Sequence, residues 1–226
     1  MAIVYIYNEI YNRIEKYYRN EYDPVPYSIG TTLTVGEFRG SSKSSVLWTN
    51  RKTVDSWNVF RRSWGRPIYV GYAFKRIWEG GHSDQSQHYA GTAFDMGQTL
   101  NSTDRDRLRN FASAAGVWSY VEPKSLTPTW VHVDDRFGLP ACSAGGFPSI
   151  VIGNKGNYVF IVQDALNALG YKVALDGVYG VNTENAIRAF QKAKGINVNG
   201  IVNCGTWTRL TDAANGIGRT STVVSP

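Results

Sequence analysis

Cysteine and histidine are both scarce in this chain of 226 residues. The two cysteines, Cys142 and Cys204, are too few for a disulfide framework or for a cysteine-rich zinc site. One disulfide between them agrees with the count, but the sequence does not establish it. Only three histidines are present, so a metal site built on imidazoles has few candidate ligands.

Long hydrophobic runs are lacking as well. No segment reaches the ~20 apolar residues that a membrane-spanning helix needs. The apolar N-terminus is interrupted by Asn8 and Glu9, and it lacks the basic region and the cleavage site of a secretory signal peptide. We therefore expect no membrane insertion, and release from the cell by another route, such as a phage lysin passing through a holin.

Dense runs of Lys and Arg with interleaved aromatic residues are absent, although the net charge is +6 and the pI about 9.3. This argues against nucleic acid as the partner and leaves an anionic cell envelope as the better candidate. The hydrophobic fraction of 42% suits a globular protein of one ordinary and one small domain, which we expect to be monomeric.

Hydrophobic spacing predicts an α+β fold. Apolar residues at helical intervals indicate helices over residues 3–22, 52–64 and 103–115. Short β-branched and aromatic runs indicate strands over residues 68–74 and 130–133. A stretch rich in Gly, Pro and Ser over residues 139–149 predicts a domain boundary, and the tail from Asn215 is expected to be disordered.

Two similar helix-and-turn units follow that boundary. Their helices end at Gly170 and Gly195, where a left-handed residue is favoured, and each leads to a tight turn. The turns are Asp176-Gly177 and Asn199-Gly200, and Thr183 and Thr206 are expected to cap the helices that come next.

This C-terminal pattern resembles the peptidoglycan-binding domain type 1 family over residues 159–210. The resemblance is carried by the paired Gln163 and Gln191, the L-G-Y and D-G-x-Y-G segments, and the closing T-W-x-x-L. It implies a compact three-helix module that binds peptidoglycan. We therefore predict a separate N-terminal domain at 1–148, a binding domain at 149–212 and a flexible tail at 213–226.

A metal site is indicated by His88, Asp95 and His132. Two histidines and one carboxylate are an ordinary catalytic zinc set that leaves one position for water. A hydrogen-bonded core histidine, or a lone His–Asp pair, explains the same residues equally simply. The small residues Gly91 and Ala93 suit a segment that must pack closely behind the metal.

The motif S-x-H-x-x-G-x-A-x-D followed by W-x-H-x-D resembles the M15 family of zinc D-Ala-D-Ala carboxypeptidases and cell-wall endopeptidases over residues 33–136. The resemblance implies that His88, Asp95 and His132 bind Zn²⁺. It also implies that residues 1–148 form a small zinc peptidase domain in which helices flank an antiparallel sheet. The bond cut in the stem or cross-link peptide is left open, between D-Ala-D-Ala, L-Ala-D-Glu and a cross-bridge.

The general base and the anion-binding residue are less obvious, because the chain departs from the family pattern. Thr129 stands where many members carry a basic or acidic catalytic residue, so Glu122 is the candidate base and Asp134 its competitor. Ala73 stands in place of the usual substrate-binding Arg.

Arg76 or Lys75 is the candidate substitute for that Arg. His82 is expected at the rim of the site. A non-catalytic wall-binding protein and a signalling domain of the same fold remain the rival readings.

Overall fold

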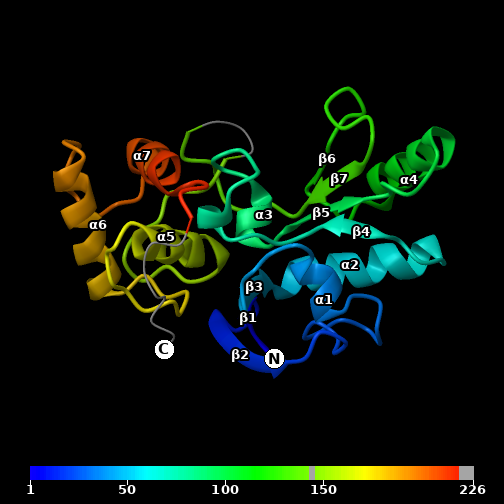
Figure 1. Cartoon of the computed structure of the whole chain (residues 1–226), viewed down its shortest axis with the longest axis horizontal. Coiled ribbons are helices and arrows are strands. Elements are labelled where there is room, and N and C mark those ends of the chain that lie inside the picture. The colour runs from blue at the N-terminus through cyan, green and yellow to red at the C-terminus, as the bar shows by residue number, and fades with distance from the viewer. Residues whose placement is uncertain (143–145, 219–226) are drawn as a thin grey trace.

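The computed structural model describes residues 1–142 and 146–218 and confirms the α+β class (Figure 1). One sheet has three strands in the order β2-β1-β3, and the other has four in the order β4-β5-β7-β6. The elements are β1 (Ala2–Asn8), β2 (Arg13–Arg19), α1 (Val35–Arg39), β3 (Val46–Asn50), α2 (Arg51–Trp64), β4 (Val70–Tyr72), the 3₁₀ turn η1 (Ile77–Glu79), α3 (Gln87–Ala90), β5 (Ala93–Met96), α4 (Ser102–Ala115), β6 (Tyr120–Val121), β7 (Val131–Asp134), α5 (Asn157–Ala168), α6 (Val181–Ala193) and α7 (Cys204–Ala214).

The N-terminal segment is a β-hairpin, so the predicted helix over residues 3–22 is wrong. Strands β1 and β2 pair antiparallel from Ala2 opposite Arg19 to Asn8 opposite Arg13. The isoleucines recur at helical intervals by coincidence. The β-branched and aromatic content of the segment favours a strand instead, because such side chains pack well on a pleated surface. Asn12, with a φ of 47°, makes the turn between the strands.

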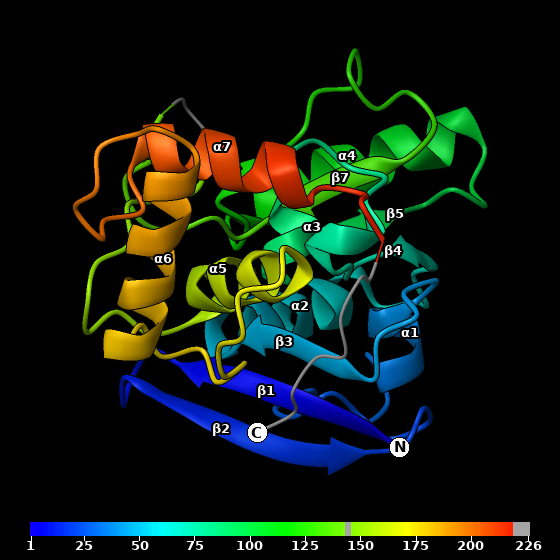
Figure 2. The ribbon, with the colours of Figure 1, turned by 60° about the vertical axis from the view of Figure 1, so that its left-hand side comes forward.

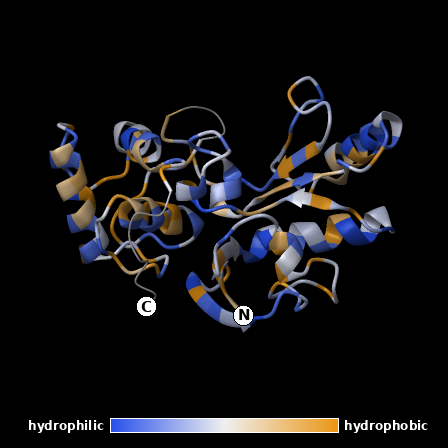
Figure 3. Cartoon of the chain, in the orientation of Figure 1, coloured by the Kyte–Doolittle hydropathy of each residue, from blue (hydrophilic) through white to orange (hydrophobic). Residues whose placement is uncertain are grey.

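The other sequence expectations for the first 135 residues hold, with shifted ends. The helices expected over 52–64 and 103–115 are α2 and α4, and the latter ends at Gly116 in the left-handed conformation. The expected strands are β4 and β7, of which β4 is the shorter. Along α2 and α4, hydrophilic and hydrophobic segments alternate in Figure 3, as expected for helices with one face in the core.

Helix α5 joins the two halves of the molecule. All twelve of its residues are buried, and it lies over β3 and β1 (Figure 2). Phe160 of this helix stacks on Trp48 with ring centroids 5.2 Å apart and belongs to the core of the N-terminal half. Ile77 and Tyr89 in turn belong to the core of the C-terminal half. The hydrophobic cores of the two halves therefore interlock.

The turns of the C-terminal half are held by the two glutamines singled out in the sequence. Gln163 accepts hydrogen bonds from the backbone N–H groups of Asp176 and Gly177, at 3.1 and 2.8 Å. Gln191 repeats the arrangement at Asn199 and Gly200, at 3.0 and 2.9 Å. In both units of the internal repeat, a buried glutamine thus accepts hydrogen bonds from the backbone of a tight turn.

Two expectations for this half are corrected. The N-caps of α6 and α7 are Gly180 and Asn203, so the predicted caps Thr183 and Thr206 lie one turn inside the helices. Asn215 is not part of a disordered tail, because its side chain donates to the His82 carbonyl and accepts from the Tyr89 hydroxyl. Residues 213 and 214, which the predicted flexible tail also included, belong to α7, and residues 219–226 of that tail lie outside the described residues.

A disulfide joins Cys142 and Cys204, a pairing that the sequence left open. In the described ranges, no helix has the length and apolar character required to cross a bilayer.

Candidate metal centre and its surroundings

The candidate ligands lie in one row across the four-stranded sheet. Tyr72 of β4 pairs with Asp95 of β5, and Asp95 pairs with His132 of β7. The backbone N–H of Glu122, directly after β6, donates to the His132 carbonyl at 2.9 Å. Directly opposed residues on neighbouring strands project from the same face of a sheet. The antiparallel register therefore brings Asp95, His132 and Glu122 together.

His88 reaches this row from α3, a single helical turn placed against the start of β5. Ser86 caps the turn, and Gly91 ends it in the left-handed conformation with a φ of 67°. The Gly91 carbonyl accepts a 2.6 Å hydrogen bond from the Thr49 hydroxyl of β3. A Cβ on Gly91 would lie 2.0 Å from the Trp48 carbonyl oxygen. The absence of a side chain at Gly91 is thus what lets the His88 turn pack on β3.

Replacing Gly91 by Ala is expected to cost more stability than replacing Gly116 by Ala. Both residues have a similar positive φ, but a Cβ on Gly116 would meet nothing within 4 Å. Strain alone costs about 1–2 kcal/mol at such a position, and the clash with Trp48 adds to it only at Gly91. Urea unfolding of both variants measures the difference. Equal losses would show that the backbone relaxes around the new methyl group.

The imidazole of His88 is oriented as a ligand would be. Its Nδ1 lies 3.0 Å from the Ala73 carbonyl, which fixes the proton on Nδ1 and leaves Nε2 with its lone pair. This Nε2 is buried and has no hydrogen-bond partner among the described residues. It lies 3.4 Å from an Asp95 carboxylate oxygen. A buried acceptor aimed at a carboxylate is costly unless a cation or donor comes between them.

His132 completes the set and is held on both sides. Its Nδ1 lies 2.7 Å from Asp95, and its Nε2 lies 3.2 Å from Asp134, which also binds Arg136. Burial disfavours the charged imidazole, but the hydrogen bonds to Asp134 and Asp95 outweigh it and raise the pKa of His132 to about 9. Asp134 thereby orients the ring and leaves Nδ1 for a metal, whose binding would displace the proton.

The donor set fits a divalent metal such as zinc. One ligand atom from each of His88, Asp95 and His132 lies within 4.8 Å of the other two. Two imidazoles and one carboxylate with an open position are typical of catalytic zinc. The third histidine, His82, lines the same pocket, with its ring 4.4 Å from that of His88. Burial, followed by the neighbouring His88, lowers the pKa of His82 to about 3, so this ring is neutral.

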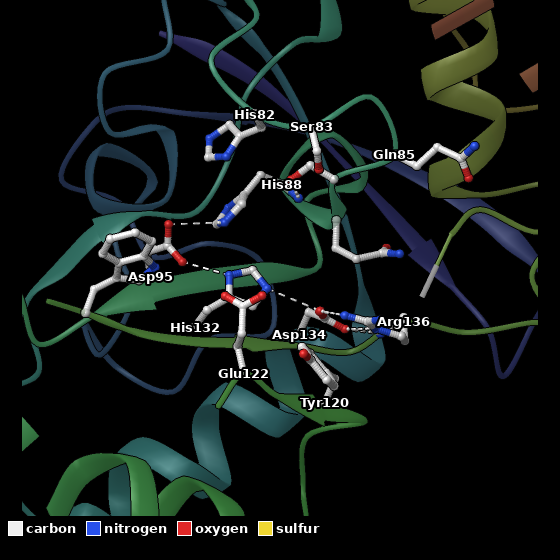
Figure 4. Close-up of a pocket in the computed structure, with 13 residues that line it drawn as sticks. His82, Ser83, Gln85, His88, Asp95, Tyr120, Glu122, His132, Asp134 and Arg136 are labelled. Atoms are coloured by element: carbon white, nitrogen blue, oxygen red, sulfur yellow. Dashed lines mark hydrogen bonds and ion pairs between the residues drawn. The ribbon is translucent and has the colours of Figure 1, made fainter. Parts of the chain in front are cut away.

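We call the hollow around these residues the metal pocket (Figure 4). It has a volume of about 300 Å³. It is lined by His82, Ser83, Gln85, Ser86, Gln87, His88, Asp95, Tyr120, Glu122, Trp130, His132, Asp134 and Arg136. The half-buried Glu122 side chain lies alongside His132, whereas Asp134 is fully buried and paired with Arg136. Glu122 is therefore the freer of the two candidate bases.

One comparison with known proteins bears on the C-terminal half. The family model described as "Putative peptidoglycan binding domain" matches residues 155–210. The chain contains a peptidoglycan-binding domain. The match includes all of residues 159–210, the stretch for which the sequence motifs suggested that family.

Two further similarities extend over parts of the chain. The carboxy-terminal processing protease CtpA of Bacillus subtilis is 29% identical over 118 residues, which is 52% of this chain and 24% of that protein. The chain thus spans about a quarter of the length of this curated relative. A peptidoglycan-binding protein from Clostridioides difficile, known from a crystal structure, is 36% identical in sequence to this chain over the matched part. The match covers 31% of this chain and 44% of that one, with a TM-score of 0.30.

Arg76 does not reach the metal pocket, in contrast to its predicted catalytic role. Its side chain is 2% exposed and forms a buried ion pair with Asp164 of the peptidoglycan-binding domain. It also donates to the Ser44 hydroxyl at 2.9 Å. The other candidate, Lys75, lies over the Tyr72 ring, with its Nζ 5.3 Å from the ring centre, and is not among the residues that line the metal pocket.

Arg136 is the cation that sequence reasoning missed. It lines the metal pocket, packs over the Tyr120 ring at 4.1 Å and is held by Asp134. The alternation in W-V-H-V-D-D-R, two residues at a time from His132, leads to Asp134, which the sequence analysis had already named. Arg136 lies beyond the end of β7, where strand alternation no longer fixes the side chain.

The peptidoglycan-binding domain also contacts the segments that carry the ligands. The Tyr158 hydroxyl donates to the Gln87 side chain at 3.0 Å and accepts from the Phe137 backbone at 3.4 Å. Asn157 donates to the Ala90 carbonyl at 2.7 Å. The first turn of α5 thus ties α3, which holds His88, to the chain that follows β7 and His132.

Proposed function

We propose that this protein is a zinc-dependent peptidase that hydrolyses stem or cross-link peptides of peptidoglycan, as a D-Ala-D-Ala carboxypeptidase or an endopeptidase. The observation that carries the proposal is the row of Asp95, His132 and Glu122 across the sheet, completed by the buried Nε2 of His88, which lies 3.4 Å from the Asp95 carboxylate. The M15-like motifs and the peptidase named among the relatives support it. The peptidoglycan-binding domain supports the choice of substrate.

Each side chain of the site has a separate role in amide hydrolysis. When bound by His88, Asp95 and His132, zinc would lower the pKa of a coordinated water and polarise the scissile carbonyl. Glu122 takes the proton of the attacking water and passes it to the leaving amine. Asp134 holds the His132 ring in place through Nε2, and Arg136 keeps Asp134 ionised.

The proposal predicts about one zinc ion per chain in the purified protein. The His132→Ala variant is expected to lose both the metal and the activity, because two ligands rarely hold a catalytic metal. His82→Ala is the control, since His82 lines the same pocket but is not one of the three clustered ligands. Elemental analysis before and after chelation measures the metal content. Full activity in a metal-free preparation would exclude a zinc peptidase.

The substrate is tested on purified peptidoglycan. The proposed enzyme releases soluble fragments whose masses identify the cut bond. The alternative is a non-catalytic wall-binding protein, which agrees with the alanine at position 73. Such a protein would bind the polymer and bind zinc without releasing fragments.

A further inference from the structure

A second hollow of about 420 Å³ lies between the N-terminal hairpin and the start of the peptidoglycan-binding domain. We call it the hairpin groove. Its walls include Tyr7, Glu9 and Asn12 from the hairpin, Phe137 from the segment after β7, and Asn154 and Lys155 from the approach to α5. Residues that are almost 150 positions apart in the sequence therefore face the same space.

The shape of the hairpin groove is fixed by contacts between the two halves. Lys155 donates from Nζ to the Asn12 carbonyl at 3.2 Å, which joins the hairpin turn to the α5 approach. Gly156 has a φ of 115°, and a Cβ at that position would lie 2.7 Å from the Tyr7 ring. The backbone of the peptidoglycan-binding domain thus rests directly against an aromatic face of the hairpin. A groove held in this way exists before a ligand arrives.

The polar groups in the walls suit a ligand that is rich in hydroxyl and amide groups. Glu9 contributes a half-buried carboxylate. Its oxygens accept long hydrogen bonds, of 3.4 Å, from the Lys52 backbone N–H. It forms no ion pair within residues 1–142 and 146–218, and the Lys52 ammonium is paired with Asp135 instead. Asn12 and Asn154 add amides, and Lys155 adds an ammonium group. A carboxylate can accept two hydroxyl groups at once, and charge-assisted bonds of this kind are the strong ones.

The hairpin groove and the metal pocket share no lining residue, but consecutive residues after β7 line one and then the other. Arg136 lines the metal pocket and the next residue, Phe137, lines the groove. Tyr158, which also lines the groove, binds Gln87 of the metal pocket. The segment after β7 and Tyr158 therefore link the walls of the two hollows.

We propose that the hairpin groove binds the glycan strand of peptidoglycan, whose N-acetylated sugars present hydroxyl and amide groups to Glu9 and the two asparagines and a ring face to Tyr7. The ligand class deepens the proposed function, since it names where the glycan lies when a stem peptide is in the metal pocket. A stem peptide is a poorer occupant, because its own carboxylates would meet the free carboxylate of Glu9.

The test measures binding of glycan strands stripped of their peptides to the full chain by calorimetry. Glu9→Gln keeps the shape of the side chain, and Tyr7→Leu removes the aromatic face. Each is expected to weaken binding ~10-fold or more, in line with the loss of a charged acceptor or an aromatic anchor. Asn197→Ala is the control, because Asn197 lines a separate hollow on the peptidoglycan-binding domain. Melting temperatures show that each variant is folded.

Three results would overturn the inference: no binding by the wild-type chain, unchanged binding in both groove variants, or loss of binding confined to Asn197→Ala. Hydrolysis of small soluble stem peptides is measured in parallel and is expected to be unchanged in Glu9→Gln. If the wild-type chain cuts no peptide but still binds glycan through Glu9 and Tyr7, the proposed peptidase function fails while the groove assignment stands.

Discussion

Glu122→Gln is expected to lower the turnover of peptide hydrolysis ~100- to 10,000-fold, the usual contribution of a general base. Glutamine keeps the size of the side chain and loses its basicity. The backbone of Glu122 stays paired with His132, and its carbonyl still accepts from the Arg109 guanidinium. Zinc content and melting temperature are therefore expected to match those of the wild-type protein.

Asp134→Asn is the matched control for the base, because Asp134 lines the same pocket but is bound to Arg136 and His132. It is expected to weaken zinc binding ~10- to 100-fold, as loss of a partner that orients a ligand does. Turnover at saturating zinc should fall less than in Glu122→Gln. If Asp134→Asn instead keeps its zinc and loses turnover while Glu122→Gln stays active, the two roles are exchanged.

The second large effect concerns stability. Arg76→Met is expected to destabilise the protein by about 3–5 kcal/mol, because it leaves the fully buried Asp164 carboxylate without its cation. The backbone N–H of Ile77, 3.3 Å from Asp164, cannot replace a guanidinium. Urea unfolding measures the loss. Arg107→Met is the matched control, since the Arg107 side chain is 70% exposed and its ion pair with Asp104 contributes little.

The double variant Arg76→Met, Asp164→Leu separates the ion pair from the packing around it. Removing both charges is expected to restore most of the lost stability, because no uncompensated charge remains buried. Peptide turnover by the folded fraction should be unchanged in every one of these variants. If Arg76→Met unfolds at the same urea concentration as the wild-type protein but loses turnover, Arg76 has the catalytic role that its place in the sequence suggested.

Much of the candidate site was readable in the sequence because strand alternation is local. His132 and Asp134 stand two apart on one strand, and Asp95 lies in a second short strand. The proximity of Glu122 to His132 depended on the pairing of β6 with β7, which is a long-range contact. The chain returns from Glu122 to His132 through a loop that contains Pro123 and Pro128.

The failures share one physical cause, which is that tertiary contacts decide what local patterns leave open. Helical spacing of isoleucines favoured a helix at the N-terminus, but β3 supplies a parallel partner for β1, and a strand then satisfies more backbone groups. Arg76 stands near the expected position of a substrate-binding residue. Its partner Asp164 comes 88 residues later, so no local signal reported the ion pair.

The interlocked cores at α5 also bear on how the protein would meet its substrate. A binding domain on a flexible linker raises the local concentration of substrate and lets the catalyst search all directions within reach. Here Phe160 stacks on Trp48, and Asp164 is paired with Arg76, so the two halves share one orientation. Under the proposed function, anchoring and cutting points are then a fixed distance apart. On a polymer with a regular repeat, the protein would therefore cut only those peptides that lie at a set distance from the sugar unit that it binds.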